Sequence, residues 1–465
     1  MTTSTSLLWG VLIVYGVVVY LMTPRRVTPA QFYRGGSAAG AEPGLVLLVS
    51  SAAVTWIFAK SIANAASLSS AFGVFGGIGY SLYYISFFTA AVAIYFIRTR
   101  GGHGSLAEFL TSKYGSLCAK LFLIAIAVRL LNEVWSNTKV TSLYFGPEGS
   151  EGYWTAAVVV TAFTLYYSVR GGLRSSMLTD GAQMVIAAVL LVIILAALTP
   201  GLAQSGLPRV DAASQMAGLT FCGLALVQTL SYPFHDPVLT DRAFIIEPRR
   251  MVKGMILAGV ISGVFILLFS IVGLYARSFG IEGNPSVAVP AAFGLPMLLV
   301  FNAIMLASAG STLDSTFSSS AKLAARDWPS NKAEPTKMEV RYGMWVMAAI
   351  ALLGNLPLLS IYMGDKVGPA IISATTISGT MVMGLAPIFL LSFIKRAGAV
   401  SFHLAFWPGL LLGVLVVIEG STGIRIFPSW IDIGSGKYAD DLGVNVFGLG
   451  VCVLGYIVGI FFGKR

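Results

Sequence analysis

The sequence predicts an all-α membrane protein that crosses the bilayer many times. Of its 465 residues, 56% are hydrophobic and only 11% are charged, and the mean hydropathy is +0.82. Thirteen apolar stretches, each long enough to span a bilayer as a helix of about 20 residues, follow one another from Leu7 to Phe462. This composition leaves little polar surface for water. We therefore expect residues 1–465 to form one membrane domain without a soluble domain.

The predicted crossings begin with residues 7–22. This stretch lacks a basic leader and runs into Thr-Pro-Arg-Arg instead of a cleavage site, so we expect a retained helix rather than a signal peptide. The other crossings are expected at 44–72, 74–97, 116–138, 153–169, 178–199, 216–233, 252–276, 288–321, 340–361, 367–394, 400–418 and 443–462.

Positive charges are distributed unevenly among the connections. Most Lys and Arg residues, Arg242 among them, fall in alternate connections and in the tail, and His235 is assigned to a turn of the same set. The opposite set holds only Arg209, Arg277, Lys366, Arg425 and Lys437, with Lys139 at a margin. Because connections rich in Lys and Arg stay in the cytoplasm, we expect an inner (cell) membrane protein with its N-terminus outside and its C-terminus inside. The net charge of +10 then faces anionic lipid, and nucleic-acid binding is not expected.

Three predicted crossings are interrupted by Gly, Ser, Thr or Asn: Val49–Gly77, Leu219–Pro233 and Pro369–Pro387. Unpaired backbone groups cost several kcal/mol in hydrocarbon, so such breaks occur where protein buries them or where they bind ions or substrate. Small residues that allow tight helix packing are the alternative explanation. The second and seventh crossings are five apart, as two related five-helix halves require.

Five charged residues fall within or near the predicted crossings, where a charge costs about 2.5–3.5 kcal/mol on insertion scales. Arg129 and Glu133 are spaced for an ion pair on one helix face, although Arg129 could instead receive a substrate carboxylate. Lys60 could pair with Asp314, hold an anionic substrate or replace a bound cation. Asp180 could be a helix N-cap or a cation ligand.

The ninth crossing holds the densest group of side-chain oxygens within the predicted membrane region. Ser308, Ser311, Thr312 and Ser315 share one helix face beside Asp314. Hard oxygen ligands without thiolate or paired imidazole suit an alkali cation, with sodium as the natural candidate, and not a transition metal. Alternatively, these hydroxyls hydrogen-bond to carbonyls of their own helix.

With these segments placed, the chain resembles the sodium/solute symporter family, which shares the inverted-repeat architecture first described for leucine-type transporters. The resemblance is carried by Gln31–Gly36, Ser105–Gly115, Arg170–Gln183, and Ser308–Ser320 together with Asp327. It implies an extra helix at 7–22, a first five-helix repeat at 44–199, a second at 216–394, and two peripheral helices at 400–462.

The resemblance also implies ligands. The hydroxyls of Ser311 and Thr312 and the carbonyl groups of Ser308, Ile57 and Lys60 are expected to hold Na+. Some members bind a second cation, for which the corresponding residues here are Asp180, Asp314 and Ser315. An ammonium group at Lys60 departs from the family pattern and bears on sodium coupling.

Together these features predict sodium-coupled uptake of a small polar solute by alternating access, with no cofactor other than Na+. Asn64, Gln228 and Tyr232 lie at the helix breaks and are expected to contact the substrate along with Lys60 and Arg129. The two cationic side chains favour a carboxylate or an amino acid.

Other functions remain open on the sequence alone. One is a urea-type or proton-coupled transporter in which Lys60 replaces a cation. Another is a membrane sensor that works with a separate signalling chain. No converging nucleophile and base suggests an enzyme.

Overall fold

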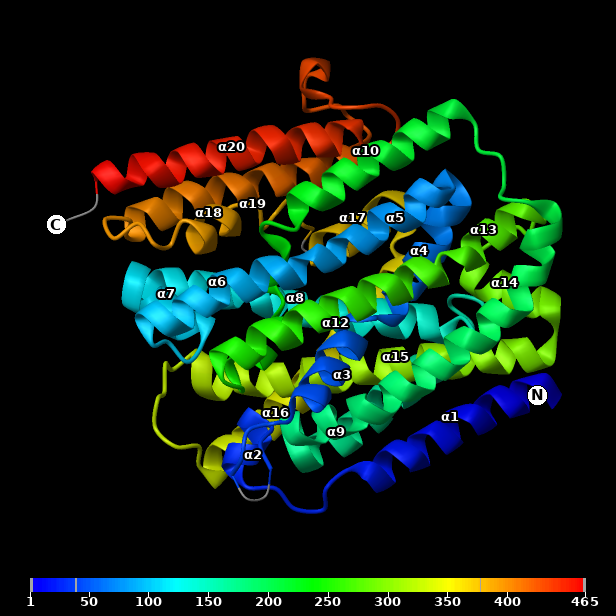
Figure 1. Ribbon diagram of the computed structural model, residues 1–465, viewed down its shortest axis with the longest axis horizontal. Coiled ribbons are helices and arrows are strands. Elements are labelled where there is room, and N and C mark those ends of the chain that lie inside the picture. Colours follow the sequence, from blue (N-terminus) through cyan, green and yellow to red (C-terminus); the bar gives the residue numbers. More distant parts are fainter. Residues whose placement is uncertain (1–2, 38–39, 377, 463–465) are drawn as a thin grey trace.

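The computed structural model describes residues 3–37, 40–376 and 378–462, which form helices and connections without a β-strand. In Figure 1 the long helices lie side by side, with α1 along one edge of the bundle and the pair α19 and α20 along the other. The first half of the described chain forms α1 (Thr3–Met22), α2 (Pro29–Arg34), α3 (Leu45–Trp56), α4 (Ala59–Phe72), α5 (Val74–Leu82), the 3-10 turn η1 (Tyr83–Ile85), α6 (Ser86–Gly101), α7 (Leu106–Tyr114), α8 (Ser116–Ser142) and α9 (Glu151–Ser205).

The second half contains more short elements. It forms α10 (Ala212–Gln228), η2 (Tyr232–His235), α11 (Pro237–Thr240), η3 (Asp241–Phe244), α12 (Pro248–Phe269), α13 (Ile271–Ser278), α14 (Pro285–Phe293), α15 (Leu295–Lys322), η4 (Leu323–Asp327), α16 (Lys337–Gly354), η5 (Leu356–Tyr362), α17 (Gly364–Thr376), α18 (Leu385–Leu390), α19 (Ala399–Thr422), η6 (Ser429–Ile431) and α20 (Ala439–Phe461).

The described helices have the length and apolar character of membrane crossings. Eight of them could each cross a bilayer, and the bent pair α3 and α4 makes a ninth. Large apolar side chains point outward on several of these helices, for example Leu21 and Phe461, which are 74% and 82% exposed. Lipid rather than water explains such a surface. The chain is therefore a polytopic membrane protein, while the count of thirteen crossings stays a prediction.

α9 contains two of the predicted crossings, 153–169 and 178–199. A straight helix of its 55 residues would be about 82 Å long, far more than the roughly 30 Å of hydrocarbon in a bilayer. The backbone leaves helical geometry at Gly172, with φ 53° and ψ −138°. A Cβ atom at this position would lie 2.5 Å from the Phe32 carbonyl oxygen, so only glycine fits the turn between the two arms of α9.

Two helix breaks occur where the sequence predicted interruptions. α3 and α4 meet at Ile57 and Phe58 with a bend of 56°. After α10, the chain runs through η2, α11 and η3 before α12 begins. α15 passes through the centre of the bundle, and every residue from Ile304 to Ala321 is buried. It packs most extensively on α9 and also contacts α3 and α8, so that the two breaks and the oxygen-rich helix converge.

Candidate functional site

The bend between α3 and α4 brings backbone oxygens close to the hydroxyl groups of α15. The Thr312 hydroxyl lies 3.2 Å from the Thr55 carbonyl oxygen and 3.0 Å from the Ser308 carbonyl oxygen. The Ser311 hydroxyl lies 3.4 Å from that of Thr55. All four residues are fully buried. The predicted contact between the broken second crossing and the ninth crossing is therefore present.

Two buried oxygens at this contact lack hydrogen-bond donors. No hydrogen bond from the described residues reaches the Ile57 carbonyl, which follows the last residue of α3. The side-chain oxygen of Ser308 is likewise buried without a partner. Buried polar groups in proteins are normally satisfied, because an unmet one costs about 1–3 kcal/mol. The Ile57 carbonyl at the bend and the Ser308 hydroxyl on α15 are hard oxygen ligands of the kind that an alkali cation prefers.

A first group of buried charges, which we call the Asp180 cluster, consists of Asp180, Arg242 and Asp314. The Arg242 guanidinium group lies 3.0 Å from Asp180 Oδ2 and donates to the Ser315 hydroxyl at 2.6 Å. Its remaining nitrogens donate to the Ser51 hydroxyl at 2.7 Å and to the Val238 carbonyl at 2.6 Å. Arg242 is 0% exposed. This residue therefore ties η3 to α3, α9 and α15 at one point.

The second carboxylate of this cluster has a different environment. Asp314 accepts hydrogen bonds from the hydroxyls of Tyr167 and Thr179, each at 3.0 Å, and from Ser315 at 3.2 Å. No Lys or Arg of the described chain forms an ion pair with it. Tyr15 of α1 lies nearby and accepts a hydrogen bond from Gln183. The predicted second cation residues Asp180, Asp314 and Ser315 are thus brought together, with Arg242 among them.

A second group of buried charges, the Glu133 cluster, consists of Lys60, Arg129, Glu133 and Asp236. Glu133 forms ion pairs with Arg129 and with the Lys60 ammonium group, the latter at 2.9 Å. Arg129 also lies 3.0 Å from Asp236, and Asn132 Oδ1 accepts from both cations. Lys60 therefore pairs with Glu133, and the pairing with Asp314 that the sequence left open does not form. The expected pair of Arg129 and Glu133 is present.

Aromatic rings connect the residues expected to contact a substrate. The Arg129 guanidinium lies 5.6 Å from the centre of the Tyr232 ring, which in turn lies 5.5 Å from the Tyr83 ring. The Tyr83 hydroxyl donates to Gln228 at 2.6 Å. Asn64 donates to Tyr80, whose ring lies 5.7 Å from that of Tyr83. Lys60, Arg129, Tyr232, Gln228 and Asn64 thus line one continuous region.

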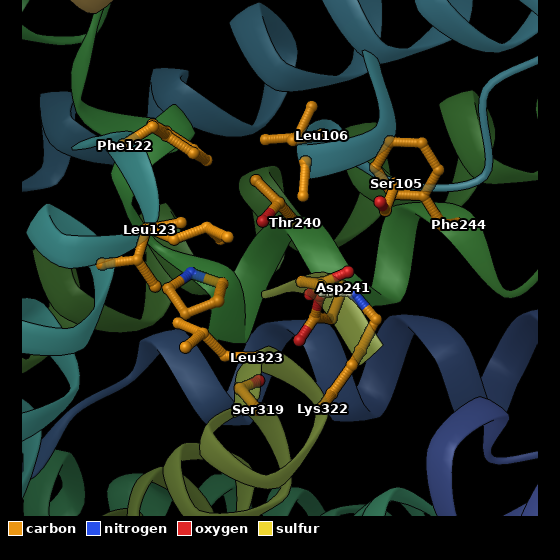
Figure 2. Close-up of a pocket in the computed structure, with 14 residues that line it drawn as sticks. Ser105, Leu106, Phe122, Leu123, Thr240, Asp241, Phe244, Ser319, Lys322 and Leu323 are labelled. Atoms are coloured by element: carbon orange, nitrogen blue, oxygen red, sulfur yellow. Dashed lines mark hydrogen bonds and ion pairs between the residues drawn. The ribbon is translucent and has the colours of Figure 1, made fainter. Parts of the chain in front are cut away.

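A third set of ion pairs lies at the far end of α15 (Figure 2). Lys322 forms ion pairs with Asp241 of η3 at 2.6 Å and with Asp327 of η4 at 3.1 Å. Figure 2 shows Asp241 and Lys322 beside a small pocket whose lining includes Ser105 and Phe122. Because Asp241 and Arg242 are consecutive residues, η3 contacts α15 at two separate points.

Several expectations need correction. Arg242 and His235 were assigned to a cytoplasmic connection, but both are 0% exposed inside the bundle. They lie there because the chain after α10 returns through the protein as η2, α11 and η3 instead of leaving it. Asp180 is an interior residue of α9 and not an N-cap. Two further residues of the site were not predicted from the sequence: Thr55, whose carbonyl accepts a hydrogen bond from Thr312, and Asp236, which pairs with Arg129. The two short apolar groups Tyr232–Phe234 and Pro237–Leu239 were the available signal that this segment is buried.

No family model and no curated protein matches the sequence, whereas solved structures do match the fold. A Na+-coupled sialic acid symporter in a substrate-bound, outward-open state is similar at a TM-score of 0.71 and 15% identity, over 99% of this chain and 98% of that one. A nucleobase-cation-symport-1 family transporter, closed around bromovinylhydantoin, is similar at 0.58 and 14% identity, over 95% and 94% of the two chains. A manganese transporter from Eremococcus coleocola, in complex with an aromatic bis-isothiourea compound, is similar at 0.51 and 12% identity, over 90% and 95%.

These likenesses define the class of fold. The chain has the all-helical, leucine-transporter-like fold of membrane transporters, as the sequence predicted. All three similar structures are transporters and none is an enzyme. At sequence identities of 12–15%, the similarity shows the fold alone. It does not show that this chain binds the substrates or ions of those proteins.

Proposed function

We propose that this protein is a secondary active transporter that couples Na+ entry to the uptake of a small polar organic solute. The observation that carries the proposal is the meeting of buried oxygens where the end of α3 contacts α15. The carbonyl groups of Thr55 and Ser308 lie beside the Thr312 hydroxyl, and the Ser311 hydroxyl lies 3.4 Å from that of Thr55. Sodium held there would join α3 to α15 and stabilise the bend. The Lys60 backbone amide donates a hydrogen bond to Asn137 Oδ1, which supports the same bend from α8.

We place the substrate in the region formed by Lys60, Asn64, Arg129, Gln228 and Tyr232, between the two broken crossings. A carboxylate or amino acid is the proposed class. The Glu133 cluster has two cationic and two anionic side chains. An amino acid, which itself carries both charges, matches this cluster better than a simple carboxylate, because each of its groups finds an opposite charge.

The transport cycle is alternating access between the repeats 44–199 and 216–394, inside the single domain 1–465. With the N-terminus outside and the C-terminus in the cytoplasm, Lys322 and its two carboxylate partners lie at the cytoplasmic end. Their ion pairs hold η3 and η4 against α15, so they must separate when substrate leaves to the cytoplasm. Sodium and substrate each raise the affinity for the other, by a coupling of about 1–3 kcal/mol.

The test compares variants of one helix in reconstituted vesicles. Thr312→Ala and Ser311→Ala are expected to lower the apparent affinity for Na+ by about tenfold or more, since about 1.4 kcal/mol of lost ligand interaction has that effect. The matched control is Ser320→Ala, because Ser320 is also buried on α15 and donates only to the Phe317 carbonyl of its own helix. If Thr312→Ala and Ser311→Ala have the same apparent affinity for Na+ as the control Ser320→Ala, the proposal is overturned.

The substrate is found by a stability screen. Purified protein is heated in sodium or potassium buffer with small carboxylates, amino acids and urea. A ligand bound only by the folded state raises the melting temperature. An amino acid that stabilises the protein in sodium and not in potassium is expected. If only urea raises the melting temperature, the substrate is urea-like and the proposed class, a carboxylate or amino acid, is wrong.

A further inference from the structure

Four buried side chains around the Tyr232 ring have hydrogen-bonding atoms without a partner among the described residues. These atoms are Trp56 Nε1, Arg129 Nε, Asn132 Nδ2 and His235 Nε2. Each of the four residues is at most 2% exposed. A buried polar atom without a partner costs about 1–3 kcal/mol, so proteins leave few of them. Four such atoms in one region indicate a ligand that binds there.

Ring contacts bring these atoms together. The Trp56 and His235 rings lie edge-on to the Tyr232 ring, with centres 6.1 Å and 4.7 Å from its centre. The Arg129 guanidinium lies 5.6 Å from the centre of the same ring, and it donates to Asn132 Oδ1 at 2.7 Å. The end of α3, the middle of α8 and η2 therefore contribute their unpaired atoms to the surroundings of one ring, between the two broken crossings.

Three of the four atoms are hydrogen-bond donors. Trp56 Nε1 and Arg129 Nε each carry an N–H and cannot accept a hydrogen bond. Asn132 Oδ1 accepts from Lys60 and from Arg129, which can only donate, so the free atom of this amide is its nitrogen. A ligand group that meets these three donors must offer several acceptor sites, as a carboxylate does.

The fourth atom is a hydrogen-bond acceptor. His235 Nδ1 lies 2.6 Å from the Tyr232 carbonyl oxygen. Because a carbonyl oxygen only accepts, Nδ1 must carry the proton of the neutral ring, and Nε2 then has a free lone pair. A ligand that meets Nε2 must donate a hydrogen bond to it.

We propose that these atoms bind the two ends of an α-amino acid, its carboxylate at the three donors and its ammonium group at His235. This inference rests on the proposed function and adds Trp56, Asn132 and His235 to the substrate-binding residues. Both ends of an α-amino acid are attached to one carbon atom, so they reach groups that surround a single ring. Because the charges of the Glu133 cluster already match, a zwitterion adds no net charge to this buried site, whereas a simple carboxylate would.

The experiment is isothermal titration calorimetry on the purified full-length protein, in sodium buffer and in potassium buffer. The probes are each standard L-amino acid, the carboxylic acid that lacks its amino group, and the amine that lacks its carboxylate. Trp56→Phe removes one N–H and keeps an aromatic ring. His235→Asn keeps a donor for the Tyr232 carbonyl, because the amide nitrogen of Asn takes the place of Nδ1, and it removes Nε2.

Each variant is expected to lose the contact with one end of the ligand. Trp56→Phe should bind the amino acid and the carboxylic acid about tenfold more weakly, and the amine as tightly as the unchanged protein does. His235→Asn should bind the amino acid and the amine more weakly, by a similar factor, and the carboxylic acid as before. A side chain that only shapes the site would weaken all three probes alike, and that result overturns the inference.

The matched control is Trp135→Phe. Trp135 Nε1 is also buried without a partner among the described residues, but this ring belongs to a separate apolar cluster with Ala157 and Leu358. The control is expected to bind every probe as the unchanged protein does. If Trp56→Phe loses no more affinity for the amino acid than Trp135→Phe does, the inference is overturned.

The outcomes separate this inference from the proposed function. Sodium-dependent binding of an amino acid, with the same affinity in both variants, overturns the assignment of the two ends and leaves sodium-coupled uptake standing. Binding that follows the expected pattern in the variants but needs no sodium supports the inference and overturns the coupling. If no amino acid binds, the proposed substrate class and this inference are both wrong. Should Trp56→Phe fail to fold, His235→Asn tests the ammonium end by itself.

Discussion

The Glu133 cluster and the Asp180 cluster are both buried in the bundle, but their charges are matched differently. In the Glu133 cluster, two carboxylates face two cations, and every member takes part in an ion pair. In the Asp180 cluster, the one guanidinium pairs with Asp180, and Asp314 accepts hydrogen bonds from hydroxyl groups only, among the described residues. The charges of the first cluster are matched without a ligand, whereas the second has a carboxylate without a cation.

This difference predicts what the loss of one charge does in each cluster. Removing one partner of a buried ion pair leaves an uncompensated charge, which is costly. Removing a carboxylate that has no cationic partner leaves no cation unpaired. We therefore expect the Glu133 cluster to govern the stability of the fold, and the Asp180 cluster to govern which ions bind.

The largest effect is expected for Glu133→Gln. It leaves Lys60 and Arg129 with Asp236 as their only carboxylate, and the free energy of unfolding should fall by about 3–5 kcal/mol. Denaturant titration of the detergent-solubilised protein measures this loss. Adding Lys60→Met should recover part of it, since the charges are matched again. If the double variant Glu133→Gln/Lys60→Met is no more stable than Glu133→Gln, the matching of charges does not stabilise the Glu133 cluster.

A smaller effect is expected for Asp314→Asn. The substitution disturbs hydrogen bonds from Tyr167, Thr179 and Ser315 but breaks no ion pair. The expected loss is about 1–2 kcal/mol, within the range for an imperfectly satisfied buried polar group. The same titration, run in sodium and in potassium, provides the measurement. The loss of unfolding free energy for Asp314→Asn could equal that of Glu133→Gln in sodium buffer but not in potassium buffer. That result would show that Asp314 binds a sodium ion, and it would contradict the difference between the clusters.

The smallest effect is expected for Lys139→Ala, which lies outside both clusters. Lys139 pairs with Glu148 at 2.8 Å, and the two side chains are 33% and 35% exposed. Partly exposed pairs of this kind contribute less than about 1 kcal/mol. The variant therefore sets the baseline for losing an ion pair in this fold. A loss comparable to that of Glu133→Gln would mean that burial does not distinguish the two kinds of pair.

Local patterns in the sequence predicted much of the fold. Apolar stretches identified the helices, and the spacing of Arg129 and Glu133 identified their ion pair, because both features depend only on neighbours along the chain. The convergence of the broken second crossing on Ser311 and Thr312 followed from the resemblance to symporters. Thr55 was missed, because which carbonyl faces α15 depends on the backbone angles at the bend.

Partners that are distant in the chain could not be predicted. Lys60 pairs with Glu133 of α8 rather than with Asp314 of α15, a choice made by packing. Arg242 was assigned to a loop because it falls between the predicted crossings 216–233 and 252–276. Its ligands come from α3, α9 and α15, and only the folded chain brings these helices to it.

The turn at Gly172 bears on where the chain tolerates inserted residues. Helical residues continue on both sides of this glycine, so the two arms of α9 have no slack between them. The Phe32 carbonyl oxygen lies against the turn and leaves no room for a longer connection. An epitope or protease site placed between these arms is therefore expected to displace α2 from α9.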